Sequence, residues 1–178
     1  LPDLTAKPVK TVSAAPIGRM LAGRDPRVRA QNIRQAGGTS YTEAAVARAL
    51  KYMVRHQRTD GSWSLQDVHN TPDCDDTCRG GGGVRSDVAA TALALLPFLG
   101  AGQTHVDGRY TDEVLKALNW LVAHQKEDGD LRGGGDGRMY AHAQAAIALC
   151  EAYALTGDEQ LREPAQAALD FIVRAQHS

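Results

Sequence analysis

Apolar residues recur at helical spacing in three segments of the chain. The spacing i, i+3, i+4, i+7, i+8 marks one face of an α-helix. The five positions of the first segment are apolar again 68 residues later, and once more after a further 51: Val46, Ala49, Leu50, Met53 and Val54; Val114, Ala117, Leu118, Leu121 and Val122; Ala165, Ala168, Leu169, Ile172 and Val173. The pattern predicts three amphipathic helices that are copies of one repeating unit.

Two segments between these helices, residues 87–96 and 140–150, are apolar on nearly every side. A helix of that kind is buried. The order amphipathic, buried, amphipathic, buried, amphipathic predicts an all-α domain over residues 40–178, in which outer helices alternate with inner ones. Ser40 and Glu43 have the spacing of a capping box and predict that Ser40 opens the first helix.

Residues 1–39 are predicted to be a basic arm or linker. Four prolines and the pair Gly37-Gly38 interrupt any long helix, and several arginines give the segment its charge. The alternative is that this arm binds an acidic partner or a membrane surface. The chain has no run of about 18 apolar residues, so we expect no transmembrane segment.

The composition favours helix-on-helix packing, because 43% of residues are hydrophobic but only 5% are aromatic. Small aliphatic residues let helices approach closely. The formal net charge is only −1, so we expect no general binding to nucleic acid, although residues 1–60 carry a net charge of +7 and residues 61–178 a net charge of −8. Three cysteines form no even disulfide framework and leave the cellular compartment open.

The segment from Arg48 to Trp63 carries a basic residue, an aromatic-aliphatic-aliphatic run, Gln57 and then Gly61. This order closely resembles the QW repeat of squalene–hopene and oxidosqualene cyclases. Residues 116–131 match it, with Leu131 in place of the final tryptophan. The third copy, from residue 167, lacks the basic residue and its turn. The resemblance covers residues 41–178. The fold that it implies is similar to that of protein prenyltransferase β subunits and complement-type thioester domains.

The resemblance implies a partial α/α toroid, because complete rings in these families have more helix pairs than this chain supplies. It also implies that Gln57 and Gln125 tie one helix end to the next turn, and that Trp63 stacks over the glutamine. A half-ring exposes an apolar inner face. We therefore expect self-association or contact with the missing half of a toroid.

The string Asp73-Cys74-Asp75-Asp76-Thr77 has the form D-x-D-D-T. In isoprenoid cyclases this pattern carries the catalytic acid, so the resemblance makes Asp73, Asp75 and Asp76 catalytic candidates. Here a cysteine, an arginine and four glycines separate it from the next helix. A solvated acidic loop is the alternative.

Three further candidates stand where the inner helices begin. Asp87 opens the first inner helix, while Tyr140 and His142 open the second. The repeat places them at one mouth of the toroid, where His142 would act as acid, base or ligand. The structural alternatives are a helix N-terminal charge for Asp87 and a satisfied buried histidine for His142.

His69, Cys74 and Cys78 are candidate metal ligands, because these side chains together with a nearby aspartate suit a tetrahedral zinc site. A Cys74–Cys78 disulfide is the alternative. His56 and His124 precede the repeat glutamines and are expected to be helix-end partners.

The sequence leaves three functional hypotheses. The chain is part of an isoprenoid-handling enzyme of the terpenoid cyclase type that binds a lipid-like small molecule; or it is a non-catalytic toroid module that binds a protein or peptide within a larger protein; or it is a zinc-dependent transferase similar to the prenyltransferases. The low aromatic content counts against the first, because cyclase cavities use aromatic rings to stabilise carbocations.

Overall fold

The computed structural model describes residues 21–24, 26–74, 78 and 81–176. These residues form helices and no strand, which confirms the all-α prediction. The elements are a short 3-10 helix, η1 (Ala22–Arg24), followed by α2 (Pro26–Gln35), α3 (Ser40–Arg55), α4 (Asp87–Gly100), α5 (Thr111–Ala123), α6 (Arg138–Thr156) and α7 (Glu159–Ala175).

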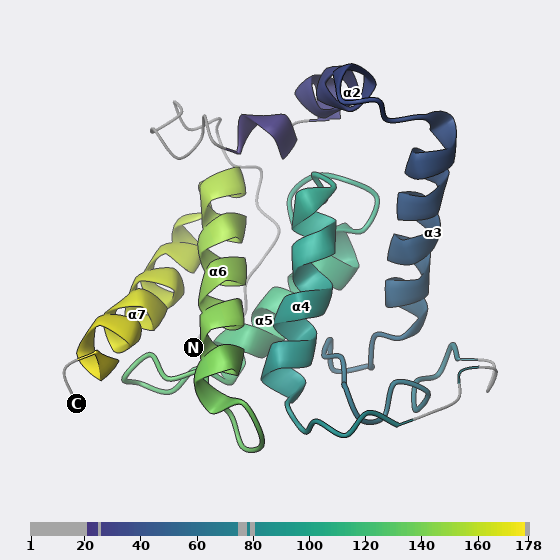
Figure 1. Ribbon diagram of the computed structural model, residues 1–178. Helices are drawn as coiled ribbons and strands as arrows, with labels where there is room; N and C mark the ends of the chain where they lie inside the picture. The colour runs from purple at the N-terminus through teal and green to yellow at the C-terminus, as the bar shows by residue number, and fades with distance from the viewer. Residues whose placement is uncertain (1–20, 25, 75–77, 79–80, 177–178) are drawn as a thin grey trace.

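The two apolar helices form the centre of the molecule. α4 and α6 pack along each other, α5 packs against α4, and α7 packs against α6. Figure 1 shows that α4 and α6 run in one direction and that α3, α5 and α7 run in the other. The C-terminal ends of the amphipathic helices and the N-terminal ends of the apolar ones therefore lie at the same end of the molecule, the lower end in Figure 1.

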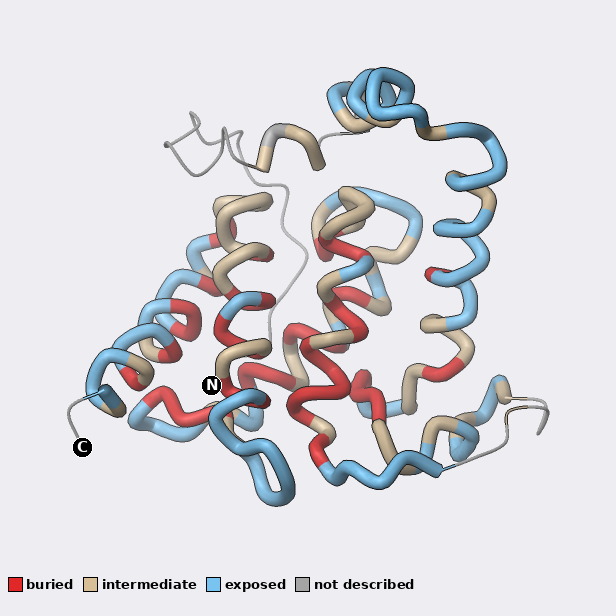
Figure 2. Tube along the Cα trace, viewed as in Figure 1, coloured by how far each residue is buried: buried red, intermediate tan, exposed pale blue. Residues whose placement is uncertain are grey.

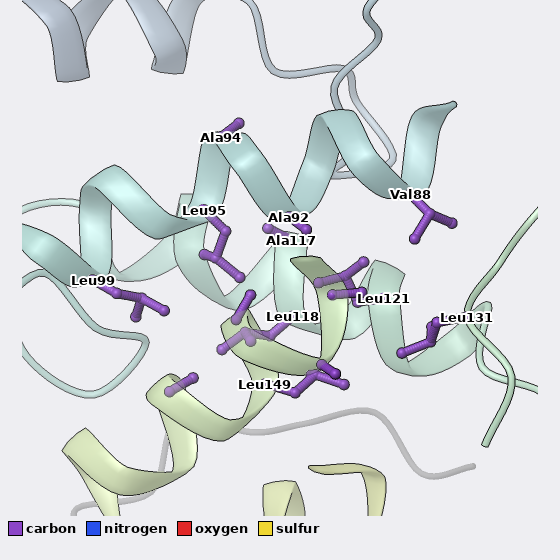
Figure 3. Close-up of a cluster of buried hydrophobic side chains, with 14 of the residues drawn as sticks. Val88, Ala92, Ala94, Leu95, Leu99, Ala117, Leu118, Leu121, Leu131 and Leu149 are labelled. Carbon is purple, nitrogen blue, oxygen red and sulfur yellow. The ribbon is translucent and has the colours of Figure 1, made fainter. Parts of the chain in front are cut away.

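The core lies where α4, α5 and α6 meet. Leu95, Leu118 and Leu149 come from these three helices, are fully buried, and gather in one cluster in Figure 3. Ala92 and Ala117 are also fully buried, and such small side chains let the helices approach closely. Burying each leucine contributes about 2 kcal/mol to the stability of the folded state.

The predicted apolar stripe is buried to a different extent in each copy. α5 buries all five positions, whereas α3 buries only Leu50. Val46 and Ala49 of α3 and Leu169 and Val173 of α7 are exposed. The most extensive contact of α3, with α4, is small, and Figure 2 shows α3 mostly pale blue and standing apart from the red centre. The stripe predicts a helix and its apolar face but not whether a neighbour covers that face.

The capping box that opens α3 lies one residue earlier than the sequence predicts. The Thr39 hydroxyl accepts from the Thr42 amide at 3.3 Å, and the Thr42 hydroxyl accepts from the Thr39 amide at 3.0 Å. Ser40 is the first helical residue, and Glu43 instead pairs with Arg29 of α2 at 2.8 Å. Within the predicted arm, Pro26 opens α2, because proline fits the first helical position.

Candidate metal centre

The repeat glutamines tie successive amphipathic helices together, as the resemblance implies. The Gln57 amide donates to Gly61 O in its own turn and to Glu113 O at the start of α5, both at 2.9 Å. The Gln125 amide donates to Gly129 O at 3.4 Å and to Pro164 O of α7 at 2.9 Å. The acceptors in the two copies are also separated by 68 and 51 residues, so both copies of the motif make the same contacts.

The glycines of the two turns sit directly on the backbone of the next amphipathic helix. Gly61 has φ +93°, and a Cβ atom there would lie 2.5 Å from Lys116 O. Gly129 has φ +84°, and its Cβ would lie 2.1 Å from Ala167 O. Because of the positive φ and the close approach, any residue other than glycine would be costly at these two positions.

His142 occupies a structural position of the repeat. Its Nδ1 accepts from the Leu131 amide at 3.0 Å, and its Nε2 lies 3.0 Å from Ala168 O. Because a carbonyl only accepts, Nε2 carries the proton. In the first copy, Thr91 stands at the equivalent place and accepts from the Trp63 amide at 3.1 Å. His142 is fully buried with both nitrogens engaged by the backbone, which fits the satisfied buried histidine.

His56 and His124 are equivalent residues at the ends of α3 and α5. Nδ1 of each lies 2.7 Å from the carbonyl oxygen four residues earlier, that of Tyr52 and of Trp120. Each imidazole also stacks on that aromatic ring, with centroids 4.0 and 3.8 Å apart. The carbonyl fixes the proton on Nδ1, so Nε2 of each neutral ring presents its lone pair.

The surroundings of the two histidines differ because of one loop. Residues 64–86 join Trp63 to α4 and number 23, whereas the equivalent residues 132–137 join Leu131 to α6 and number 6. This difference of 17 residues accounts in full for the unequal repeat offsets of 68 and 51. The longer segment, which we call the inserted loop, carries both Cys74 and Cys78.

The inserted loop returns to the end of α3. The Thr71 hydroxyl donates to Arg55 O at 2.9 Å, and the Arg55 side chain donates to Asp73 O at 3.5 Å. These bonds hold the loop beside His56 and explain how residues far apart in sequence meet.

His56, Cys74 and Cys78 form a compact group. Their ligand atoms, Nε2 or Nδ1 and the two Sγ atoms, all lie within 4.8 Å of one another. Nε2 of His56 lies 3.1 Å from Cys78 Sγ. His56 is buried, and both cysteines are half-buried and free of disulfides. Soft sulfur atoms and an imidazole at this distance are the donor set of a zinc site.

Tyr52 contacts two members of this group. Its ring stacks on His56, and its hydroxyl lies 3.9 Å from Cys78 Sγ. Partial burial raises the pKa of Tyr52, and the hydrogen bond and the charges of the neighbouring cysteines act in the same direction. The phenol therefore stays protonated beside the sulfur atoms.

The remaining predicted residues do not join this group. His69 is exposed and is not a member, so His56 stands where the sequence predicted His69. Asp73 is exposed, while Asp75 and Asp76 lie outside the described residues. Tyr140 is also exposed.

Asp87 pairs with Arg58 at 2.8 Å and borders a cleft of about 330 Å³. The cleft lies at the end of the molecule where α4 begins, and Trp120 and His124 also line it. The pairing with Arg58 engages the carboxylate, in keeping with a charge at a helix N-terminus.

The sequence analysis did not include His56 among the candidate ligands, because the repeat gives it the same place as His124. The available signal was the uneven repeat offset, which places the two cysteines in an insertion directly after the turn that follows His56.

No helix in the described part of the chain is long and apolar enough to cross a membrane. No protein-family model matches the sequence, and no solved structure matches the fold.

Proposed function

We propose that this chain is a zinc-binding α/α-repeat module in which His56, Cys74 and Cys78 hold Zn²⁺ and fasten the inserted loop to the end of α3. The observation that carries the proposal is the convergence of three ligand atoms, from two separate segments, within 4.8 Å. No other histidine, cysteine or acidic residue among those described joins the group.

The geometry suits zinc. In a tetrahedral site with Zn–S of 2.3 Å and Zn–N of about 2.1 Å, ligand atoms lie about 3.5–3.8 Å apart. His56 Nε2 and Cys78 Sγ lie 3.1 Å apart, in hydrogen-bonding contact, so they would have to separate by about 0.5 Å to admit the ion. Nε2 already presents its lone pair, because Nδ1–H is held by Tyr52 O. Such a hydrogen bond orients metal-bound histidines in general.

The charges also balance. Two thiolates and a neutral imidazole bring a divalent cation to net zero, which lowers the cost of burying it beside α3. Three protein ligands leave a fourth position on zinc, which water or another donor fills. Because the unfolded chain holds no formed site, zinc binding adds to the free energy of unfolding.

The wider architecture that we propose is a segment of an α/α toroid. The equivalent contacts of Gln57 and Gln125, and of Gly61 and Gly129, support it. The isoprenoid-enzyme hypothesis has less support, because His142 is fully buried with both ring nitrogens engaged by the backbone and Asp87 is paired with Arg58.

A second candidate function is the docking of a protein partner. Its specific support is the uncovered part of the apolar face of α3, where Val46 and Ala49 are exposed. The equivalent face of α5 is buried, so α3 presents a surface of a kind that neighbouring helices cover elsewhere in the same chain.

The proposed zinc site is tested by metal titration of the reduced protein. Co²⁺ substitution should give the intense sulfur-to-cobalt charge-transfer band of a dithiolate site, and one equivalent of Zn²⁺ should displace it. Cys74→Ser and Cys78→Ser should each weaken zinc binding by about 100-fold or more, since even losing an outer-shell partner costs 10–100-fold.

Cys150→Ser is the matched control, because Cys150 lies in α6 and outside the ligand group. It should bind zinc like the parent protein. A reduced protein that takes up no zinc at micromolar concentrations, or that binds it equally well without Cys74, would contradict the proposal.

A further inference from the structure

We infer that Cys74 and Cys78 are a site of reversible oxidation, at which hydrogen peroxide joins the two sulfur atoms in a disulfide and expels the metal. This inference rests on the proposed zinc site and adds a regulation of it. It gives the inserted loop two alternative states, metal-bound and disulfide-bonded, that use the same two side chains.

The sulfur atoms already lie close together. They are within 4.8 Å of each other, and a disulfide requires about 2.05 Å. The sulfur atoms therefore need to approach by less than about 3 Å, and neither cysteine lies in a helix. Both side chains are half-buried rather than enclosed, so a small oxidant has access to them.

Cys150 provides the contrast within the same chain. It lies in the apolar helix α6, outside the ligand group. Burial raises the pKa of its thiol, which lowers the thiolate fraction on which reaction with peroxide depends. Cys150 is also half-buried, but it lies outside the group that brings two sulfur atoms together, so disulfide formation should be selective for Cys74 and Cys78.

The chemistry balances in two steps. The sulfur of Cys78 attacks one oxygen of hydrogen peroxide, the O–O bond breaks, and a sulfenic acid and one water form. The sulfur of Cys74 then attacks the sulfenic sulfur, the S–S bond forms, and the second water leaves. Two electrons pass from the sulfur pair to peroxide. The two protons needed come from the thiols, or from solvent when the thiolates are bound to zinc.

Loss of both thiolates leaves only His56 as a zinc ligand, which is too few to hold the ion. The bond from Thr71 to Arg55 O involves neither cysteine, and both cysteines lie outside the helices, so we expect oxidation to leave the chain folded. A dithiol reductant should reverse the reaction, because disulfide exchange regenerates both thiols.

The test starts from zinc-loaded protein, whose metal content is verified before any oxidant is added. Hydrogen peroxide is then added in the presence of a chromogenic zinc chelator, and the disulfide is mapped by mass spectrometry of peptides. We expect release of one zinc per chain, a Cys74–Cys78 disulfide, a free Cys150, and recovery of zinc binding after dithiothreitol.

Variants separate the roles of the cysteines. Cys150→Ser should release zinc at the parental rate. Cys78→Ser should form no intramolecular disulfide and should keep a free Cys74 thiol after mild peroxide treatment and reduction, because the partner sulfur atom is lost.

The two proposals fail in different ways. Protein that holds no zinc at the loading step refutes the proposed function. Protein that is loaded with zinc but keeps both the metal and two reduced thiols under peroxide refutes the inference while the zinc site stands. Zinc loss accompanied by overoxidation of single cysteines, without the disulfide, also refutes it.

Discussion

The ends of α3 and α5 are built from the same contacts but surround different chemistry. In both, a histidine is hydrogen-bonded to the carbonyl oxygen of the aromatic residue four positions earlier and stacks on its ring. A glutamine donates to the backbone at the start of the next amphipathic helix, and a glycine packs against the backbone of that same helix. At α3 the histidine is His56, buried beside two cysteines; at α5 it is His124, exposed on a cleft.

This difference shows how a repeat can gain a cluster of potential ligand atoms. The packing of successive helices fixes the backbone of the turn, so the conformation of the turn cannot vary much between copies. The connection to the following apolar helix is free to lengthen, because loop closure costs free energy only slowly with length. The inserted loop places two cysteine sulfur atoms beside a histidine that the repeat already orients.

The largest expected effect is on zinc affinity, when alanine replaces one or the other of the two equivalent histidines. His56→Ala should reduce zinc affinity by about 100-fold or more, because a direct ligand is lost rather than an outer-shell partner. His124→Ala should leave zinc affinity unchanged. Competition with a chelator of known affinity measures both. Equal losses in the two variants, or none in either, would break the comparison.

The turn glycines should respond alike, because this part of the repeat is shared. Gly61→Ala and Gly129→Ala each force a side chain into a left-handed conformation and against a carbonyl oxygen. We expect each to lower the free energy of unfolding by about 2–3 kcal/mol, measured by urea denaturation of the zinc-free protein. Gly83→Ala is the control, because its Cβ would meet nothing within 4 Å.

The smallest predicted effect is on the acid sensitivity of the turn that follows α5. Asp130 is buried and stands where the first copy has Ser62. Burial alone would raise its pKa, but hydrogen bonds from Arg132 and Lys126 outweigh it and hold the pKa well below the ordinary value. Its stabilisation is therefore present above the ordinary aspartate pKa and is lost as the pH falls below about 4.

Asp130→Asn should lower stability at pH 7 by about 1–2 kcal/mol and should make the acid limb of the stability profile shallower. Ser62→Ala changes the equivalent residue of the first turn and removes a hydroxyl that donates to Asp60. Burial would raise the pKa of Asp60, but its hydrogen bonds from Ser62 and Trp120 outweigh it, so this variant should also make the acid limb shallower, though by less than Asp130→Asn. Thermal unfolding between pH 7 and pH 2.5 records both. An acid limb that is equally steep in the Asp130 variant would contradict the assignment.

The sequence predicts the part of the fold that is periodic. The three stripes give α3, α5 and α7, and the apolar segments give α4 and α6, because burial imposes a helical period on side chains. It does not predict that the stripe of α3 stays exposed, since this depends on a neighbour that no periodicity records. The cap at Thr39 was missed because Ser40 offers a matching pattern one residue later.

The site was predicted only in part. Cys74 and Cys78 were identified by their chemistry, but their partner is His56 and not His69, because a loop that folds back is not described by spacing along the chain. His142 was chosen for its place at the start of a buried helix. Its structural role depends on Leu131 N and Ala168 O, which lie far from it in sequence.

The most direct test of the central claim is X-ray absorption at the zinc edge of the loaded, reduced protein. The account predicts two sulfur neighbours at about 2.3 Å and one imidazole nitrogen at about 2.0–2.1 Å, with a light atom completing the tetrahedron. The sulfur shell should fall to one in Cys74→Ser. A first shell of nitrogen and oxygen alone would show that the inserted loop does not hold the metal through its cysteines.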